Sequence, residues 1–435
     1  MPTQPYLLGA TTLALLVCAA ALVSPTAGPC LHYVIAFMAL LAMTINVRTG
    51  RESFHIGAPM LVALCAPLLV LLVSCVVHVP WSASEFEKQL RFALAAPIAW
   101  LLLRADRRWL RQVQWAFLFS AYAGSLVLIT VVSTNELGRM AVSDYGGRYN
   151  AVTFANLTLF FGFAATMTIP WTSSPWPRLE NILKAAATPV TLYAVWLSQT
   201  RSSWVLAGLL PLVILLGNKQ WSRRAKARFL AGALGILMLG STYAWYSPAS
   251  RMSAVWSDVQ RYEHQDRDTS VGIRIQLWRA SWLVFEKSPL LGVGPSQFRA
   301  ELARLEKAGV VTPTVVEGYG EPHNDFLNAL AGYGLLGFLS VCCLYFVPAA
   351  LFLQRLRDTD AATRAAARIG LLFTLGYACF SMTEMMFRNM RSVPIYAVTV
   401  VVLYVLVSPR PVRRVVHKTA AVADAAPALG VAVGD

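Results

Sequence analysis

Runs of about twenty apolar residues recur along almost the whole chain, and they constrain its fold more than any other feature. The hydrocarbon core of a bilayer is about 30 Å thick, and a helix needs roughly 20 apolar residues to cross it. Hydrophobic residues make up 57% of the 435 residues and charged residues only 14%, a balance that argues against a soluble protein. We therefore expect an all-α integral membrane protein with about twelve transmembrane helices. The expected spans are residues 6–24, 30–46, 58–78, 84–103, 113–133, 151–171, 185–200, 203–218, 229–247, 325–353, 369–387 and 393–408.

The first apolar run could instead belong to a secretory signal peptide, since small residues follow it at positions 26–28. A signal peptide carries positive charge ahead of its apolar part. The opening residues MPTQP contain no Lys or Arg, and many more apolar runs follow. We therefore expect residues 6–24 to be retained as the first helix.

The segments that connect the spans predict the orientation. The strongly basic ones fall on one side if the spans alternate, and the positive-inside rule makes that side the cytoplasm. Both termini then lie in the cytoplasm. The formal net charge of +15 therefore reflects membrane topology, and we expect no nucleic-acid partner. The basic segments are residues 104–112, 219–228, 354–368 and 409–418.

One long segment, at about 248–324, falls on the opposite, external side. Its charges nearly balance, and apolar residues recur at helical spacing over 253–262 and 272–287, with a third helical pattern ending near Lys307. We expect a helical external loop that packs on the outer face of the bundle. The predicted organisation is transmembrane helices 1–9 in residues 1–247, the external loop at 248–324, helices 10–12 in 325–408, and a disordered cytoplasmic tail at 409–435.

The most titratable cluster lies where this loop meets the next apolar run. His323 is flanked by Glu321 and Asp325, which could orient an imidazole that acts as a base. A simpler interpretation makes these residues a helix entry, with Asn324 or Asp325 as the N-cap. Small residues in the apolar run would let this helix pack closely on a neighbour and hold the cluster in place. They are Gly332, Gly334 and Gly337.

Several arginines on the external side indicate an anionic ligand. Arg201 stands in a polar stretch between two apolar runs, Arg274 and Arg279 lie in an amphipathic pattern, and Arg148 follows two glycines. Each could instead be an anchor at a helix end or an ordinary solvated charge. Guanidinium groups match phosphate oxygens bidentately, so a lipid with a diphosphate head group would satisfy all these positions.

Two further features have structural interpretations. Glu384 belongs to an expected span, and we predict that it forms an ion pair with Arg388 one turn later. The seven cysteines show no CxxC spacing, so we expect no metal site.

The motifs TRSSW at 200–204, GIRIQLWRAS at 272–281, GVGPSQF at 292–298 and PHNDFLNALAGYGLLGF at 322–338 resemble those of the O-antigen ligase family. The resemblance is strongest over about 190–340. It implies a glycosyltransferase of the bacterial inner membrane that uses neither a metal ion nor another cofactor and acts on the periplasmic face. Such an enzyme moves a finished polysaccharide from undecaprenyl diphosphate to the lipid A–core oligosaccharide.

The resemblance also implies roles for single residues. Arg201 and Arg274 would bind the diphosphate of the donor, and His323 would be catalytic. The resemblance implies no definite role for Arg148 and Arg279, which stay possible substrate-binding residues. The implied partners are the undecaprenyl diphosphate-linked donor, the lipid A–core acceptor and membrane lipids.

Three other functions stay open at the level of the sequence. An O-antigen polymerase and a protein O-oligosaccharyltransferase belong to the same superfamily. A transporter of lipid-linked sugars would place polar residues within several spans. The ionisable residues here cluster on one side, which favours chemistry at a single surface.

Overall fold

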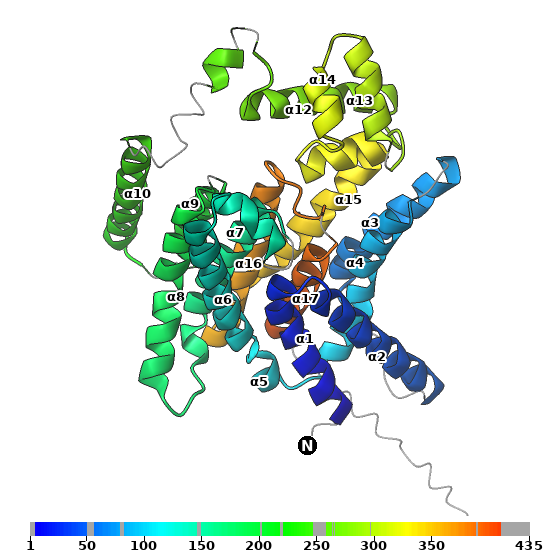
Figure 1. The fold of residues 1–435 in the computed structure, drawn as a ribbon. Coiled ribbons are helices and arrows are strands. Elements are labelled where there is room, and N and C mark those ends of the chain that lie inside the picture. The colour runs from blue at the N-terminus through cyan, green and yellow to red at the C-terminus, as the bar shows by residue number, and fades with distance from the viewer. Residues whose placement is uncertain are drawn as a thin grey trace, which may run out of the picture.

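The computed structural model describes residues 5–49, 56–78, 82–145, 149–200, 202–217, 221–246, 258–262, 264, 266–295, 297–388 and 390–409. Within these residues the chain forms helices and no strands. The long helices make one bundle, and a small group of helices lies at one end of it (Figure 1). The all-helical class predicted from the sequence is confirmed for the described part of the chain.

Each predicted span corresponds to one helix. The helices are α1 (Pro5–Val23), α2 (Ala27–Thr49), α3 (Ala58–Val77), α4 (Ala83–Leu102), α6 (Val113–Thr134), α7 (Ala151–Met167), α8 (Pro177–Leu197), α9 (Ser203–Gly217), α10 (Arg223–Tyr246), α15 (Asp325–Arg355), α16 (Ala361–Ser381) and α17 (Ser392–Val407). Short elements connect some of them: α5 (Arg107–Leu110), η1 (Gly138–Asp144) and η3 (Ile169–Trp171).

Five segments are long and apolar enough to cross a membrane by length and composition. Shorter apolar helices include α7 and α17, which are well buried within the bundle. The membrane character of the chain therefore rests on the described helices, whereas the number of twelve spans and their orientation remain predictions. The five segments are Pro5–Val23, Ala27–Asn46, Ala58–Val77, Arg107–Thr134 and Asp325–Arg355.

Helix α8 is longer than the sequence predicted, because it begins at Pro177 rather than near residue 185. The added turns carry Glu180 and Lys184, charges that argued against a span. In the structure both side chains are buried, and Lys184 Nζ lies 2.6 Å from Glu180 Oε1 and 2.7 Å from Gln114 Oε1. The ion pair and the hydrogen bonds give each buried charge a partner, which offsets the cost of burying it.

Helix α16 ends earlier than predicted. It is capped by Asp360, whose side chain accepts a hydrogen bond from the Thr363 amide, and it stops at Ser381. Residues 382–388, which we call the 382–388 loop, are therefore not part of a span. The loop carries Glu384 to the same end of the bundle as His323, and this displacement changes the interpretation of both residues.

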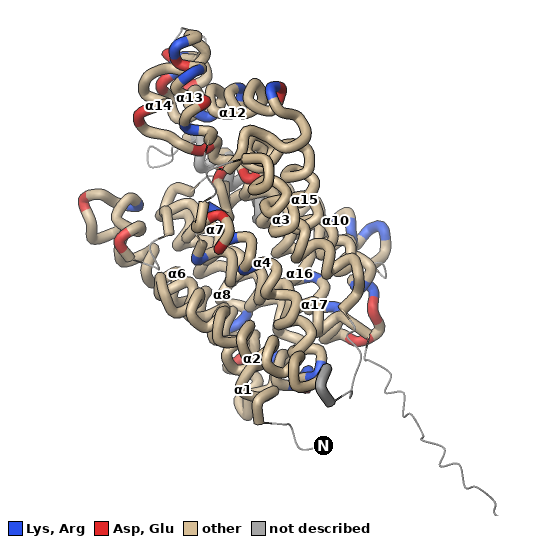
Figure 2. Tube along the Cα trace, turned by 90° about the vertical axis from the view of Figure 1, so that its right-hand side faces the viewer, with Lys and Arg blue, Asp and Glu red and all other residues tan. Residues whose placement is uncertain are grey.

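The helices at the end of the bundle form a cap with its own core. The cap consists of α12 (Ser270–Lys287), α13 (Phe298–Lys307) and α14 (Pro313–Gly318). Charged residues of both signs gather there, whereas the long helices below carry few (Figure 2). The predicted helices over 272–287 and up to Lys307 are confirmed, while the expected pattern over 253–262 is described only from residue 258, where the chain is helical. The cap core contains Ile273, Leu277, Ala280, Val284, Phe298, Leu302, Leu305, Val311 and Val315, with Ala331 of α15 packed against them.

A break in α15 joins the cap to the bundle. Gly334 has φ 63° and ψ −154°, which interrupts the helix one turn beyond the cap contact. The turn after α12 hydrogen-bonds into this break: the Val293 amide donates to Ala331 O at 3.0 Å, and the Leu335 amide donates to Pro289 O at 2.8 Å. A Cβ atom on Gly334 would lie 2.4 Å from the carbonyl carbon of Leu290. The glycines thus leave room for the backbone of the turn that follows α12. The sequence had instead predicted that they allow close packing on another helix.

Candidate functional site

His323 and Glu384 form a hydrogen-bonded pair at the cap end of the bundle. The distance from His323 Nδ1 to Glu384 Oε1 is 3.2 Å. Glu384 is nearly buried, with 4% of its side chain exposed, whereas 19% of the His323 side chain is exposed. The ring of Tyr319, from the cap, meets the imidazole edge to face with centroids 5.6 Å apart. Nε2 of His323 has no hydrogen-bond partner among the described residues.

The carboxyl group of Glu384 is held in its ionised form. Burial alone would raise its pKa, but the hydrogen bond from His323, the charge of that imidazole and the charge of Arg274 together hold the pKa of Glu384 below its ordinary value. An ionised carboxylate can only accept, so Nδ1 of His323 must donate the proton. In the neutral imidazole Nε2 then carries the free lone pair, and this nitrogen lies on the more exposed side of the pair.

The backbone of His323 is in the left-handed region, with φ 51°. A residue with a side chain adopts this conformation only where its surroundings hold it there. Asn324 supplies part of that restraint, because its Oδ1 accepts hydrogen bonds at 2.9 and 3.1 Å from the amides of Phe326 and Leu327 in the first turn of α15. The N-cap interpretation of this residue is therefore confirmed, and it coexists with the pairing of His323.

Asn324 and Asp325 also hold the 382–388 loop. Asn324 Nδ2 donates to Met382 O at 3.1 Å. Asp325 Oδ2 accepts from the Met386 amide and from the hydroxyl of Tyr345, each at 3.0 Å. These contacts come immediately before and after Glu384 in the chain, so the residues that follow His323 fix the carboxylate that binds it.

Three predicted pairings are wrong. Glu321 does not orient His323 but lies 2.8 Å from Arg388, Oε2 to Nε, in a partly exposed ion pair. The sequence predicted Arg388 as the partner of Glu384, but Arg388 pairs with Glu321 instead. The reason is the end of α16 at Ser381, which removes the helical spacing that would have placed residues 384 and 388 on one face. Asp325 likewise turns away from the imidazole.

Arg274 approaches this pair from α12. Its charge contributes to the lowered pKa of Glu384. Its terminal nitrogen is 3.4 Å from Ser270 Oγ, and its buried Nε has no hydrogen-bond partner. The indole nitrogen of Trp278, one helical turn further, is also a buried donor without a partner. Neither donor has a partner among the described residues, so both are free to donate to an anionic group.

The other predicted arginines do not join this cluster in the described structure. Arg279 is exposed, since a spacing of five residues directs it away from Arg274 on the helix. Arg148 and Arg201 lie outside the described residues, and their assignments remain predictions.

The polar residues around Arg201 are occupied with one another. Ser203 Oγ donates to Asn156 Oδ1 on α7 at 2.6 Å, and the hydroxyls of Ser198 and Thr200 are 2.9 Å apart. These bonds anchor the turn between α8 and α9 on α7. The polar stretch thus supports the turn between α8 and α9.

From the sequence, His323 and Arg274 were named as candidate site residues, but Glu384 was paired with Arg388 and its contact with His323 was missed. No group of three or more His, Cys, Asp or Glu side chains that could hold a metal ion occurs in the described part of the chain.

Comparisons with known proteins agree with the motifs. Residues 186–342, from α8 to the break in α15 and beyond it, match the family model described as O-Antigen ligase. An O-antigen ligase of Escherichia coli is 23% identical over 305 residues, which cover 68% of this chain and 65% of that protein. A Haemophilus influenzae protein that bears no functional name is 23% identical over 186 residues, or 42% of this chain and 46% of that protein. The chain thus spans about half to two thirds of the length of these relatives. The family match includes both Arg274 and His323, so this part of the chain is similar to the O-antigen ligase family.

Proposed function

We propose that the protein is an O-antigen ligase, which transfers a polysaccharide en bloc from undecaprenyl diphosphate to a sugar hydroxyl of the lipid A–core oligosaccharide. The observation that carries this proposal is His323, whose Nδ1 contacts the buried carboxylate of Glu384 and whose Nε2 has no partner among the described residues, with the cation of Arg274 near that carboxylate. A base next to a site for an anion is what transfer from a diphosphate donor needs.

The reaction follows from this arrangement. The hydroxyl oxygen of the acceptor attacks the anomeric carbon of the donor, and Nε2 of His323 removes the hydroxyl proton. The bond between the anomeric carbon and the phosphate oxygen breaks, and its electron pair leaves with undecaprenyl diphosphate. Glu384 stabilises the imidazolium that forms, as a carboxylate does in other acid–base pairs of this type.

The charge on the departing diphosphate is neutralised by arginine. Arg274 is placed to do so from α12, and Arg201 is proposed for the same role, with Arg148 and Arg279 as possible further contacts. A diphosphate is already a good leaving group, so its departure requires no general acid. The chemistry we propose involves no metal ion and no cofactor.

The depth of the site is consistent with two lipid-anchored substrates. His323 precedes the first turn of α15, a long apolar helix, so the reacting groups lie near one end of the bundle. We propose that this end faces the periplasm from the bacterial inner membrane, with both chain termini in the cytoplasm.

The purified protein, incubated with the lipid-linked polysaccharide and with lipid A–core, tests the proposal. We expect full-length polysaccharide to appear on the core, and we expect His323→Ala to abolish transfer while donor binding persists. Arg274→Ala should instead weaken donor binding, and Arg274→Lys should restore little of it, because an ammonium cannot reproduce a bidentate contact.

Alternative products would reassign the function within the superfamily. Joining of two lipid-linked repeats would identify a polymerase, and transfer to a protein hydroxyl would identify a protein O-oligosaccharyltransferase. No transfer to any acceptor, with lipid-linked sugar moved across a vesicle membrane, would identify a transporter.

A further inference from the structure

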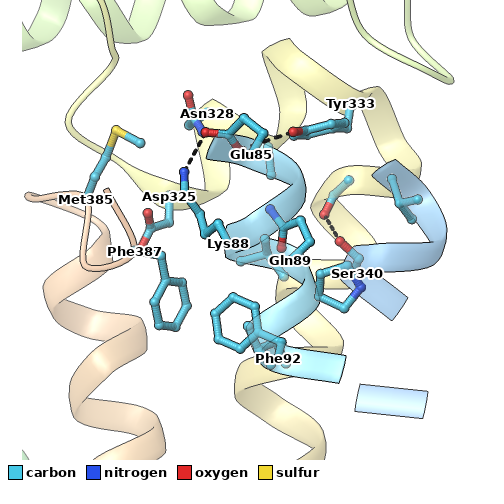
Figure 3. A pocket seen from close by; sticks show the side chains of 16 residues that line it. Glu85, Lys88, Gln89, Phe92, Asp325, Asn328, Tyr333, Ser340, Met385 and Phe387 are labelled. Atoms are coloured by element: carbon cyan, nitrogen blue, oxygen red, sulfur yellow. Dashed lines mark hydrogen bonds and ion pairs between the residues drawn. The ribbon is translucent and has the colours of Figure 1, made fainter. Parts of the chain in front are cut away.

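A cavity that the reaction described above does not use is lined by Asp325 and Met385, which are near neighbours of His323 and Glu384 in the chain. It lies between α3, α4, α15 and the 382–388 loop, and Figure 3 shows polar side chains of α4 and α15 facing each other across it. Its volume is about 50 Å³, which is room for roughly three to five waters. This space would admit the hydroxyl-bearing edge of one sugar ring, but no larger part of an oligosaccharide.

The cavity contains a small polar network and two unpaired amides. Lys88 Nζ donates to Glu85 Oε1 at 2.6 Å, and the hydroxyl of Tyr333 donates to Glu85 Oε2 at 3.3 Å. The side-chain amides of Gln89 and Asn328 also line the cavity but make no side-chain hydrogen bond with the described residues. Each amide offers both donors and an acceptor. A sugar hydroxyl, which donates and accepts, could pair with either group.

The charge of this cavity does not suit a diphosphate. Its cation, Lys88, is already paired with Glu85, and the carboxyl group of Asp325 lines the same space. The unpaired donors that suit an anion are on α12, at Arg274 and Trp278. The two regions thus differ in chemistry: α12 offers a cation and an indole donor, whereas the cavity contains a paired lysine, carboxyl groups and two amides.

The position of the cavity connects it to the reacting pair. Asp325 follows His323 by two residues, and Met385, which also lines the cavity, follows Glu384 directly. On its apolar side the lining includes Val70 of α3 and Val341 of α15. The neighbouring side chains of those helices are exposed, with Leu69 59% and Leu339 48% accessible, as expected for surfaces that face lipid. The cavity therefore lies next to apolar surfaces that a lipid-anchored molecule can reach.

We propose that this cavity, formed around Glu85, Lys88, Gln89, Asn328 and Tyr333, binds the accepting sugar of the lipid-anchored acceptor and presents one of its hydroxyls to His323. The donor then occupies the Arg274 side and the acceptor the α4 side, with the base between them. The inference rests on the proposed function for the identity of the acceptor, whereas the binding of a sugar-bearing lipid can be measured without transfer.

The unpaired amides supply the sharpest test, because their removal breaks no side-chain hydrogen bond among the described residues. Binding of purified lipid A–core to the full chain in detergent, without donor, would be measured for wild type, Gln89→Ala, Asn328→Ala and the double variant. One neutral hydrogen bond corresponds to about two- to tenfold in affinity, so the double variant should bind roughly 5- to 100-fold more weakly. Affinity for the undecaprenyl diphosphate-linked donor should be unchanged.

Two further variants complete the test. Val70→Trp fills the apolar side of the cavity at a partly exposed position, and we expect it to abolish acceptor binding while donor binding persists. Asn135→Ala removes an amide at the end of α6, outside the cavity, that bonds only its own helix at Val131 O. This control should bind the acceptor as wild type does.

The outcomes separate this inference from the proposed function. Wild-type acceptor affinity in both the double amide variant and Val70→Trp would overturn the assignment of the cavity, even if transfer proceeds. Equal competition by a phospholipid without sugar would also overturn it, since the site would then be a lipid cleft. Acceptor binding that depends on the amides, in a protein that never transfers polysaccharide, would uphold the cavity and refute the ligase proposal.

Discussion

Replacing Glu384 by Gln tests whether this carboxylate acts on the reaction through His323. The substitution keeps the shape of the side chain but removes its charge, so that Nδ1 of the imidazole loses an obligate acceptor. The amide can donate to Nδ1 as well as accept from it, and donation would place the imidazole proton on Nε2, where it blocks the base. We therefore expect a loss in kcat with little change in the KM for donor.

The size of the loss follows from the contact. A hydrogen bond to a charged group contributes about 1.5–3 kcal/mol, which corresponds to roughly 10- to 150-fold in rate. The separation of 3.2 Å between His323 Nδ1 and Glu384 Oε1 is long for a charge-assisted bond. Because Glu384 is almost fully buried, solvent screening does not reduce the effect further. We expect a decrease of roughly 10- to 30-fold in kcat.

The assay compares initial rates of transfer for Glu384→Gln, Glu384→Asp and Glu321→Gln over a range of donor concentrations. Glu384→Asp keeps the charge and should recover part of the rate. Glu321→Gln removes a carboxylate that pairs with Arg388 at the surface, and it should change kcat by less than about threefold. A wild-type kcat in Glu384→Gln, or equal losses in Glu384→Gln and Glu321→Gln, would refute the positioning role.

The stability of the folded protein should also depend on pH through Glu384, and the direction of this dependence can be predicted. The pKa of Glu384 is lowered in the folded protein, so its contribution is present above the ordinary carboxyl value of about 4.3 and is lost as the pH falls through the lowered value. The difference in unfolding temperature between wild type and Glu384→Gln should therefore be largest near neutral pH and shrink below about pH 4. A difference that grows on acidification would contradict the ionised state assigned here.

Three further predictions concern the base and the fold. If His323 is the base, activity should fall on acidification because a protonated imidazole cannot take a proton, whereas a phosphate-binding imidazolium would make activity rise. Gly334→Ala should destabilise the protein and weaken donor binding, because the added Cβ would lie 2.4 Å from the Leu290 carbonyl carbon. Gly309→Ala is the control: Gly309 has a similar positive φ but open space around it, so this variant measures the cost of backbone strain alone. Lys184→Met leaves the buried carboxylate of α8 unpaired and should cost about 3–5 kcal/mol of unfolding free energy, and adding Glu180→Gln to that variant should restore part of the loss.

The positions of the helices could be predicted from the sequence because a membrane imposes a simple rule of length and apolarity. That rule failed where buried side chains satisfy each other. It excluded the first turns of α8, which bury the pair of Glu180 and Lys184. It extended α16 through the 382–388 loop, because methionine and phenylalanine are as apolar in a packed loop as in a span.

The candidate site was predictable only where its residues are close in the sequence. His323 and Asn324 stand in one motif, and the capping role of Asn324 followed from its position before a helix. The partner of His323 is 61 residues further along the chain, at Glu384, and no periodicity connects them. Nearby acidic residues were therefore assigned to the imidazole, although Glu321 and Asp325 bind elsewhere.

The break in α15 explains how one apolar helix can support both halves of the proposed reaction. Before Gly334, the first turns of α15 follow His323 and hydrogen-bond to the turn after α12, which fixes the cap with Arg274. The same turns supply Asn328 and Tyr333 to the cavity on the opposite side. After the break, the helix continues into the apolar bundle. A straight helix would leave no gap for the backbone at Leu290, and the cap would lose its attachment next to the base. The kink thus lets a single rigid segment fix the base between a cationic site and a neutral one.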